Sequence, residues 1–443
     1  METIMIKKIL ITMLFSLLFA TGYSQKMNVA KLDSLFQILE AKDKFMGSIA
    51  VSQNGTIIYS KSIGKEDVET NKKATNLSKY RIGSISKMFT SILIFKAIEE
   101  KKLSLNQTIA IYFPTIENAT KITIGNLLNH RSGIHNFTND PEYFKYNTEP
   151  KSEEQMIEII TKGKSDFEPN SKANYSNSNY VLLSYILQKT YKKKFADILK
   201  DKITKPLGLK NTYAGDKISV QNNESNSYRF SEKWIKETET DMSIPMGAGS
   251  IVSNPTDLTI FIENLFANKI INDSSLKQMV TLQDNYGMGI FQIPFYDKKG
   301  FGHTGGIDEF RSVLYYFPED KIAVALTSNG KTYDNNDIII AALSSYFNKP
   351  FVIPTFKNIE FKTEDLDPYL GEYSDAGFPM KITITKDNLK LFAQATGQSA
   401  FPLEATEKDK FEFLAAGIKL EFKPNEKQMI LKQGGGAFKL TKK

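Results

Sequence analysis

The order of strand-like and helix-like segments along residues 45–346 is the feature that most constrains the fold. The stretch GSIAVSQNGTIIYSKS contains two β-rich runs around Asn54-Gly55, a residue pair that favours a tight hairpin turn. Near the other end, FRSVLYYFPEDKIAVALTSNG predicts two strands joined through residues 318–320, and helical stretches alternate with loops in between. Strands at both ends can pair in one sheet, so the pattern predicts an α+β fold with flanking helices.

The composition changes after NKPFVIPTF, residues 348–356, which we interpret as part of a linker over 348–358. Beyond it, short strand patterns such as MKITITK, IKLEFKP and QMILKQ are separated by turn residues. This pattern predicts an antiparallel meander that closes into a small β-barrel over residues 359–443. Residues 25–347 are then expected to form the larger, first domain.

The first residues carry a targeting signal. Lys7 and Lys8 precede an apolar run over residues 9–20, and small or polar residues follow. The run is shorter than the roughly 20 residues that a membrane-spanning helix needs. The order basic, apolar, small predicts a secretory signal peptide over residues 1–24, with an uncleaved anchor as the alternative. We therefore expect a cleaved, exported protein, periplasmic or extracellular.

Composition excludes several classes of function. The 443 residues include no cysteine, which rules out disulfides and a cysteine nucleophile, and the three histidines show no metal-binding spacing. The net charge of +7 arises from 57 basic and 50 acidic residues without a long basic run, so no nucleic-acid partner is expected. No metal or other cofactor is implied, and the oligomeric state is left open.

Ser84 and Lys87 in RIGSISKMFT are the first candidates for catalytic chemistry. Ser84 opens a run whose apolar residues cover most of a helix circumference, so we expect a buried helix with Lys87 one turn along the same face. Burial disfavours the ammonium form and lowers the lysine pKa, so more of the side chain is the neutral amine that can accept a proton. The same spacing recurs in three places that lack this helical setting. Ser62/Lys65 lies past the hairpin, Ser274/Lys277 at an exposed helix start and Ser328/Lys331 in the expected turn SNGK.

A serine nucleophile also needs a proton carrier and donors for the oxyanion. KANYSNSNYVLL offers Tyr175, whose hydroxyl can take and pass on a proton beside a lysine, and Asn177, which can orient a substrate amide. The stretch HTGG, residues 303–306, leads into a predicted strand. The backbone N–H groups of Gly306 and Ser84 are the expected oxyanion pair.

In this order, Ser-x-x-Lys, Tyr-x-Asn and His-Thr-Gly resemble the motifs of the serine β-lactamase and penicillin-binding-protein superfamily, most closely its class C-like branch, over residues 30–346. The resemblance implies an antiparallel sheet flanked by helices, followed by a lipocalin-like barrel. It implies that Ser84 is the nucleophile, Lys87 the adjacent base and Tyr175 the general base and acid. It also implies a substrate cleft lined by Asn177, His303, Thr304 and Gly305.

His303 departs from the family pattern, because β-lactamases usually have lysine at this position. An unperturbed imidazole titrates near about 6.5, so His303 is a weaker partner for a substrate carboxylate, and Arg311 is the alternative cation. We therefore expect a serine hydrolase acting through a Ser84 acyl-enzyme on amide, D-amino-acid peptide or ester bonds, with a small-molecule or cell-wall peptide substrate. The alternatives are a β-lactamase proper and a penicillin- or cell-wall-binding protein with little turnover.

Three further features have simpler interpretations. His130 is expected to be structural, bonding a backbone carbonyl beneath the cleft, and His135 to lie in a surface loop. The polar segment 215–242, which contains Trp234, is expected to be a lid or a plain loop.

Overall fold

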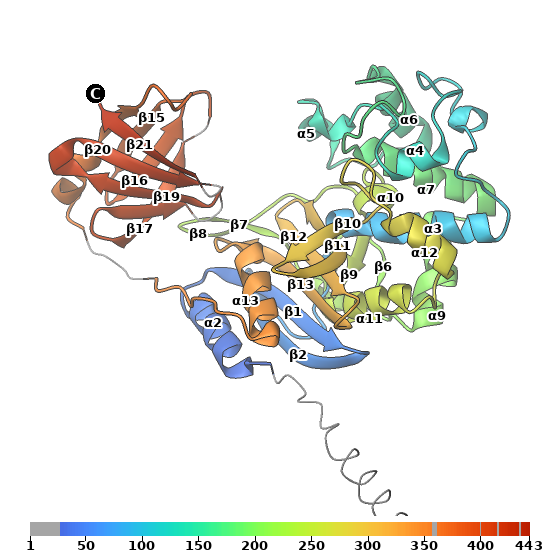
Figure 1. Ribbon diagram of the computed structural model, residues 1–443, viewed down its shortest axis with the longest axis horizontal. Helices are drawn as coiled ribbons and strands as arrows, with labels where there is room; N and C mark the ends of the chain where they lie inside the picture. Colours follow the sequence, from blue (N-terminus) through green and yellow to red (C-terminus); the bar gives the residue numbers. More distant parts are fainter. Residues whose placement is uncertain (1–26, 357–360, 399, 414–415, 434–435) are drawn as a thin grey trace, which may run out of the picture.

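The computed structural model describes residues 27–356, 361–398, 400–413, 416–433 and 436–443 (Figure 1). A larger body of helices and sheet precedes a separate closed barrel at the C-terminal end. The predicted signal peptide, residues 1–24, lies outside the described residues, as do residues 357–358 of the predicted linker. Within the described part of the chain, none of the helices combines the length and apolar character that crossing a bilayer requires.

A six-stranded antiparallel sheet forms the centre of the larger body. Its strand order is β10-β11-β12-β13-β1-β2, so the N-terminal hairpin is paired with the last strand before the barrel, as predicted. The strands are β1 (Phe45–Gln53), β2 (Thr56–Ile63), β10 (Phe291–Phe295), β11 (Lys298–Ile307), β12 (Phe310–Phe317) and β13 (Ile322–Lys331). The hairpin turn forms at Asn54-Gly55 because both residues adopt the positive φ that a two-residue turn requires.

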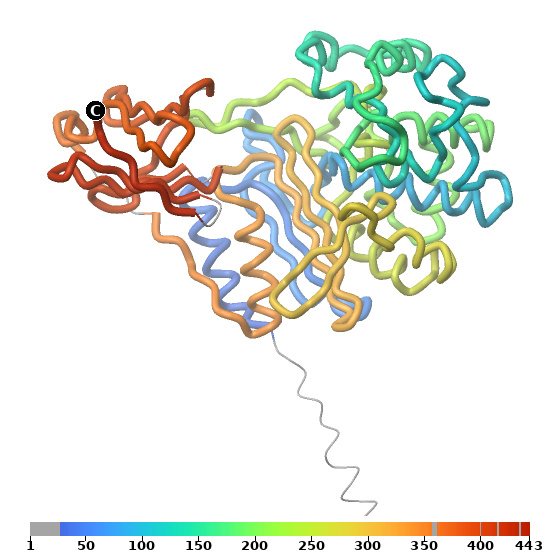
Figure 2. Tube along the Cα trace, turned by 45° about the horizontal axis from the view of Figure 1, so that its top comes forward, coloured from blue at the N-terminus to red at the C-terminus, as the bar shows by residue number. Residues whose placement is uncertain are grey.

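Helices cover both faces of this sheet. Helix α2 (Val29–Ala41) and helix α13 (Asn335–Phe347) pack on one face, and helix α11 (Pro255–Phe266) packs on the other (Figure 2). One buried apolar cluster joins α2, α13 and the sheet, and a second cluster fills the helical region beyond the opposite face. The predicted α+β class is confirmed.

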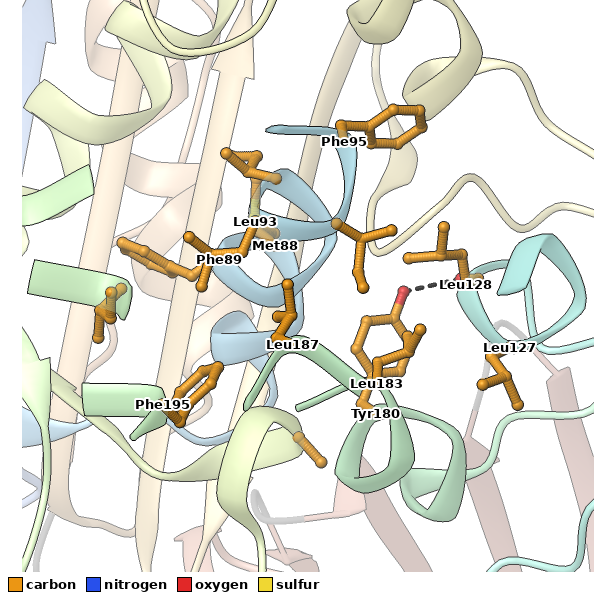
Figure 3. Close-up of a cluster of buried hydrophobic side chains, with 14 of the residues drawn as sticks. Met88, Phe89, Leu93, Phe95, Leu127, Leu128, Tyr180, Leu183, Leu187 and Phe195 are labelled. Atoms are coloured by element: carbon orange, nitrogen blue, oxygen red, sulfur yellow. Dashed lines mark hydrogen bonds between the residues drawn. The ribbon is translucent and has the colours of Figure 1, made fainter. Parts of the chain in front are cut away.

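Helix α3 (Ser86–Glu99) runs through the second cluster (Figure 3). Its side chains are buried from Ser86 to Phe95, as the apolar residues on all sides of this segment predict. The Phe89 ring stacks on Phe261 of α11 at a centroid distance of 3.7 Å, and the Tyr180 hydroxyl donates to the Leu128 carbonyl at 2.7 Å. Tight packing on every side fixes the position of α3 relative to the sheet.

Shorter elements complete the larger body. The other helices are α4 (Ile124–Leu128), α5 (Tyr143–Tyr146), α6 (Glu153–Lys162), α7 (Asn177–Tyr191), α8 (Phe195–Leu199), α9 (Lys205–Leu207), α10 (Met246–Gly249) and α12 (Asp273–Val280). The small sheets contain β3 (Lys65–Asp67), β4 (Lys72–Lys73), β5 (Tyr80–Arg81), β6 (Tyr213–Ala214), β7 (Tyr228–Ser231), β8 (Lys233–Lys236) and β9 (Ile251–Ser253).

One local expectation is wrong, and for a second segment one of the two alternatives is excluded. The stretch SNGK is not a turn, because Ser328, Gly330 and Lys331 continue β13 and pair with β1. Segment 215–242 is not a plain loop, since it contains the hairpin β7–β8, which extends toward the barrel (Figures 1 and 2). Trp234 lies in β8 and donates from its ring N–H to Asp43, which ties the hairpin to the body.

The C-terminal strands form a closed antiparallel barrel, as predicted. Apolar side chains from these strands fill the interior. Two of these strands, β14 and β17, have no counterpart among the strand patterns predicted from the sequence. The barrel consists of β14 (Gly371–Ser374), β15 (Ile382–Asp387), β16 (Lys390–Ala395), β17 (Phe401–Glu407), β18 (Lys410–Phe413), β19 (Ile418–Lys423), β20 (Gln428–Gln433) and β21 (Gly436–Lys442).

Replacing Phe89 with alanine tests the role of α3 in holding the body together. The ring is fully buried, so its loss should destabilise the larger body by about 3–5 kcal/mol through lost burial and a residual cavity. Phe144→Ala is the matched control, because that ring is 78% exposed. Thermal and urea unfolding should show a lower midpoint for Phe89→Ala alone; equal midpoints for the two variants would contradict the assignment.

Candidate active site

Ser84 lies in a short 3-10 turn, Gly83–Ile85, directly before α3. The turn is pressed against strand β11. A Cβ atom on Gly83 would come within 2.7 Å of the Gly306 nitrogen, and Gly83 has a φ of +49°. Glycine is therefore required here on both counts, and the contact brings the backbone of Ser84 and the backbone of β11 together.

Lys87 is fully buried and its amine lies against Ser84. Lys87 Nζ is 3.0 Å from Ser84 Oγ, 2.7 Å from Asn177 Oδ1 and 2.8 Å from the Ala248 carbonyl oxygen. Burial holds the pKa of Lys87 well below its usual value. In its neutral form the amine has two N–H groups, which can donate to the Asn177 and Ala248 oxygens. Its lone pair then faces the Ser84 hydroxyl.

Tyr175 and Asn177 come from the start of α7. Asn177 bridges two parts of the site, since its Oδ1 accepts from Lys87 and its Nδ2 donates to Thr138 Oγ1 at 3.0 Å. The Tyr175 ring lies 4.9 Å from Lys87 Nζ. Burial raises the pKa of Tyr175, although a hydrogen bond with Ser84 opposes the shift. Tyr175 is therefore a phenol, not a phenolate, at neutral pH.

The glycines of the third motif fit strand β11 against the serine turn. The motif lies inside β11, not ahead of the strand as expected. A Cβ on Gly305 would come within 2.0 Å of the Ile82 carbonyl oxygen, and the same oxygen accepts from Ser312 Oγ at 2.7 Å. This contact seats β11 beside Ser84. Thr304 is exposed and, with Gly305, borders a shallow hollow next to the start of α13.

His303 is buried behind Tyr175, and its ring centroid is 6.3 Å from the Tyr175 ring. Burial lowers the pKa of His303 to about 3, so the ring is neutral. Its Nδ1–H donates to the Thr304 carbonyl, and Nε2 is then a buried acceptor to which none of the described residues donates. His303 therefore supplies no positive charge.

Ser84, Asn177 and Gly306 line one cleft of about 400 Å³. Arg311 lies at the same cleft, where its guanidinium packs beside Gly306 and donates to the backbone carbonyls of Asp308 and Phe310. The sequence did not predict the remaining lining, which is largely apolar and includes Phe137, Tyr143, Phe144, Ile244 and Pro245. No motif in the sequence marks these residues.

The other two histidines lie close to the site. His130 is buried against the Tyr175 ring at a centroid distance of 4.5 Å. Its Nδ1 accepts from the Ser176 backbone N–H, so the expected bond to a backbone carbonyl is replaced by a bond to a backbone donor. His135 faces Asp166 and Asp140 and is only partly exposed. Among the described residues, no group of three or more His, Asp or Glu side chains is placed to bind a metal ion.

The fold and the site geometry together define a serine hydrolase in which a buried lysine, not a histidine–aspartate pair, lies beside the serine. The family model for Beta-lactamase matches residues 33–344, and the chain belongs to this family. The family resemblance and the hydrolase class predicted from the three motifs are confirmed.

One curated relative and two solved structures show which proteins this chain is similar to. Teichoic acid D-alanine hydrolase from Staphylococcus aureus (strain MRSA252) is 28% identical over 318 residues, which cover 69% of this chain and 76% of the relative. The structure of D-amino acid amidase from Ochrobactrum anthropi SV3 superimposes with a TM-score of 0.63 at 22% identity and covers 72% of this chain and 99% of that one. The penicillin-binding protein homologue from Pyrococcus abyssi gives a TM-score of 0.66 at 24% identity and covers 94% of this chain and 100% of that one.

Gly305→Ala tests whether β11 must lie against the serine turn. The new Cβ would overlap the Ile82 carbonyl, so the turn and strand must separate and the Gly306 and Ser84 N–H groups lose their alignment. Loss of one oxyanion donor typically costs about 10²-fold in rate, and we expect a similar drop in the labelling of Ser84 by an alkyl fluorophosphonate.

Gly306→Ala is the contrasting variant, because its Cβ would meet only the Arg311 side chain at an ordinary 3.5 Å. Its thermal midpoint should match that of the parent, whereas that of Gly305→Ala should fall. Normal labelling and stability in Gly305→Ala would disprove the close contact.

Proposed function

We propose that the protein is an exported serine hydrolase that cleaves D-aminoacyl ester or amide bonds through an acyl-enzyme on Ser84. The observation that carries the proposal is the buried Lys87 amine, 3.0 Å from Ser84 Oγ, whose other two neighbours are oxygen acceptors. The names of the relatives support the substrate class, since one hydrolyses teichoic acid D-alanine and another is a D-amino acid amidase. Export follows from the predicted signal peptide.

Acylation starts when Ser84 Oγ attacks the substrate carbonyl carbon and its proton passes to the Lys87 amine. The Ser84 and Gly306 N–H groups stabilise the oxyanion. Because Tyr175 is protonated, it acts first as an acid: its hydroxyl proton passes to the leaving alcohol or amine, and the Lys87 ammonium returns a proton to Tyr175. Water then attacks the acyl carbon and gives a proton to the Lys87 amine. The bond between that carbon and Ser84 Oγ breaks, Oγ takes the proton back from Lys87, and the free acid leaves.

The alternative is a β-lactamase or penicillin-binding function. The neutral His303 argues against it, because the position that usually presents a lysine ammonium to a substrate carboxylate carries no charge here. Arg311 is the remaining cation at the cleft and is our candidate for binding an anionic part of the substrate. The penicillin-binding protein homologue among the relatives keeps this alternative open to test.

Intact-mass analysis distinguishes these functions. The mature protein should form an adduct with an alkyl fluorophosphonate, release the acid from D-alanine amide or a D-alanine ester faster than from the L-isomers, and leave penicillin unconsumed. Ser84→Ala should neither form the adduct nor release the acid. A stable or rapidly hydrolysed penicillin adduct would favour the alternative, and absence of any adduct would refute Ser84 as the nucleophile.

Lys87→Arg tests the lysine as the proton acceptor. Arginine keeps a long donor side chain but stays protonated, so it cannot take the serine proton. The rate of Ser84 labelling should fall by about 10²–10⁴-fold, the usual contribution of a positioned general base. Lys96→Arg, a control in the last turn of α3, should label like the parent. Parental rates in Lys87→Arg would exclude lysine as the base.

A further inference from the structure

Residues 136–147, here called the aromatic wall, form one side of the Ser84 cleft. Five of them line it: Phe137, Thr138, Tyr143, Phe144 and Asn147. The wall consists of the 3-10 turn Phe137–Asn139 and the single-turn helix α5. Such short elements make few internal hydrogen bonds, so their position depends on side-chain contacts with neighbouring segments.

Asp140 is the residue that joins the two halves of the wall. Its N–H donates to the Phe137 carbonyl, and its own carbonyl accepts from the Tyr143 N–H at 3.0 Å. Its carboxylate oxygen lies 3.1 Å from His135 Nε2. His135 Nδ1 lies 2.8 Å from a carboxylate oxygen of Asp166, in the loop after α6. The imidazole thus links the wall to a segment outside it.

This arrangement determines the protonation of His135. An ionised carboxylate only accepts hydrogen bonds, so each ring nitrogen that faces one must carry a proton. Both bonds therefore form only with the imidazolium. The two carboxylates raise the pKa of His135 against a smaller opposing effect of burial, and among the described residues they are the charged groups that act on it.

The backbone of the same loop holds the catalytic side of the cleft. The His135 carbonyl accepts from Ser178 Oγ at 2.6 Å, and the Asn136 side-chain oxygen accepts from the Asn177 N–H at 2.9 Å. Asn177 in turn contacts Lys87. A shift of this loop would therefore displace both the aromatic wall and the Asn177 side chain.

We propose that His135 is a positioning residue whose imidazolium clamps the aromatic wall between Asp140 and Asp166 and thereby makes substrate binding sensitive to pH. The inference rests on the proposed function, because it assigns the wall to substrate contact. Below the His135 pKa both bonds hold the wall. As pH rises through that pKa, one carboxylate faces a ring nitrogen without a proton, the clamp opens, and the binding contribution is lost.

The first test measures the clamp without activity. The chain has three histidines, and burial depresses the pKa of both His130 and His303, so His135 should be the one that titrates above about 6.5 in proton NMR. Asp166→Asn should lower this pKa. Glu168→Gln, which removes from the same loop a carboxylate that pairs with Lys121, should not. A His135 pKa at or below the ordinary value would overturn the proposal whatever the enzyme does.

The second test measures Ser84 labelling by an alkyl fluorophosphonate against pH. The clamp is partly exposed and such pairs are weak, so we expect the parent rate constant to fall only about two- to fivefold on the alkaline side. His135→Gln should lack this decline and label at the lower rate throughout. Asp166→Asn should keep the decline but at lower pH, which separates loss of the clamp from a folding defect. Lys87 also titrates in the parent, and its effect should persist in His135→Gln.

The outcomes separate the two proposals. No labelling of the parent at any pH refutes the nucleophile and the proposed function, while the NMR titration still decides the clamp. Labelling with the same pH profile in the parent and in His135→Gln overturns the clamp and leaves the proposed function intact. For D-alanine amide, the clamp predicts that His135→Gln changes KM more than kcat; a change confined to kcat would contradict a role in binding.

Discussion

Lys87 is buried, and none of the described carboxylates pairs with it; the rest of the site depends on this constraint. A buried ammonium is costly unless it is paired, and the three atoms around Lys87 Nζ are a hydroxyl, an amide oxygen and a backbone carbonyl. Burial holds the Lys87 pKa low, which favours the neutral amine, and that form can satisfy these neighbours with two donated bonds and one accepted bond. The same packing that stabilises α3 therefore supplies the base that the serine needs.

The site is assembled from backbone contacts as much as from side chains. Gly83 and Gly305 let the serine turn and β11 approach closely enough that any side chain at either position would overlap a backbone atom. The sheet, which is built from both ends of the body, fixes the position of β11. Helix α3 fixes the position of Ser84, and helix α7 fixes that of Asn177. The chemistry thus rests on the relative position of two rigid layers, and the cleft wall opposite is formed by short elements that need external contacts.

The sequence alone was sufficient to predict a structural element where the pattern has a local physical cause. The Asn54-Gly55 turn and the all-round apolar helix at 86–99 each predict what the structure contains. Of the four residues predicted to line the substrate cleft, Asn177 lines the Ser84 cleft, whereas His303 is buried and Thr304 and Gly305 border a neighbouring hollow. The sequence was insufficient where tertiary pairing overrides composition: SNGK has a turn composition, yet residues 328–330 are buried in β13 and paired with β1. The Ala248 carbonyl beside Lys87 and the aromatic wall also had no signal, because backbone oxygens and scattered aromatic residues have no characteristic spacing.

The most direct test of this account is the pKa of Lys87 itself, measured by NMR titration of protein with isotope-labelled lysine side chains and assigned by the signal missing in Lys87→Arg. The account predicts a value well below that of an ordinary lysine, because burial without a carboxylate disfavours the ammonium. Titration at the ordinary value, about 10.4, would contradict it, since Lys87 would then be a cation at working pH and could not accept the proton of Ser84.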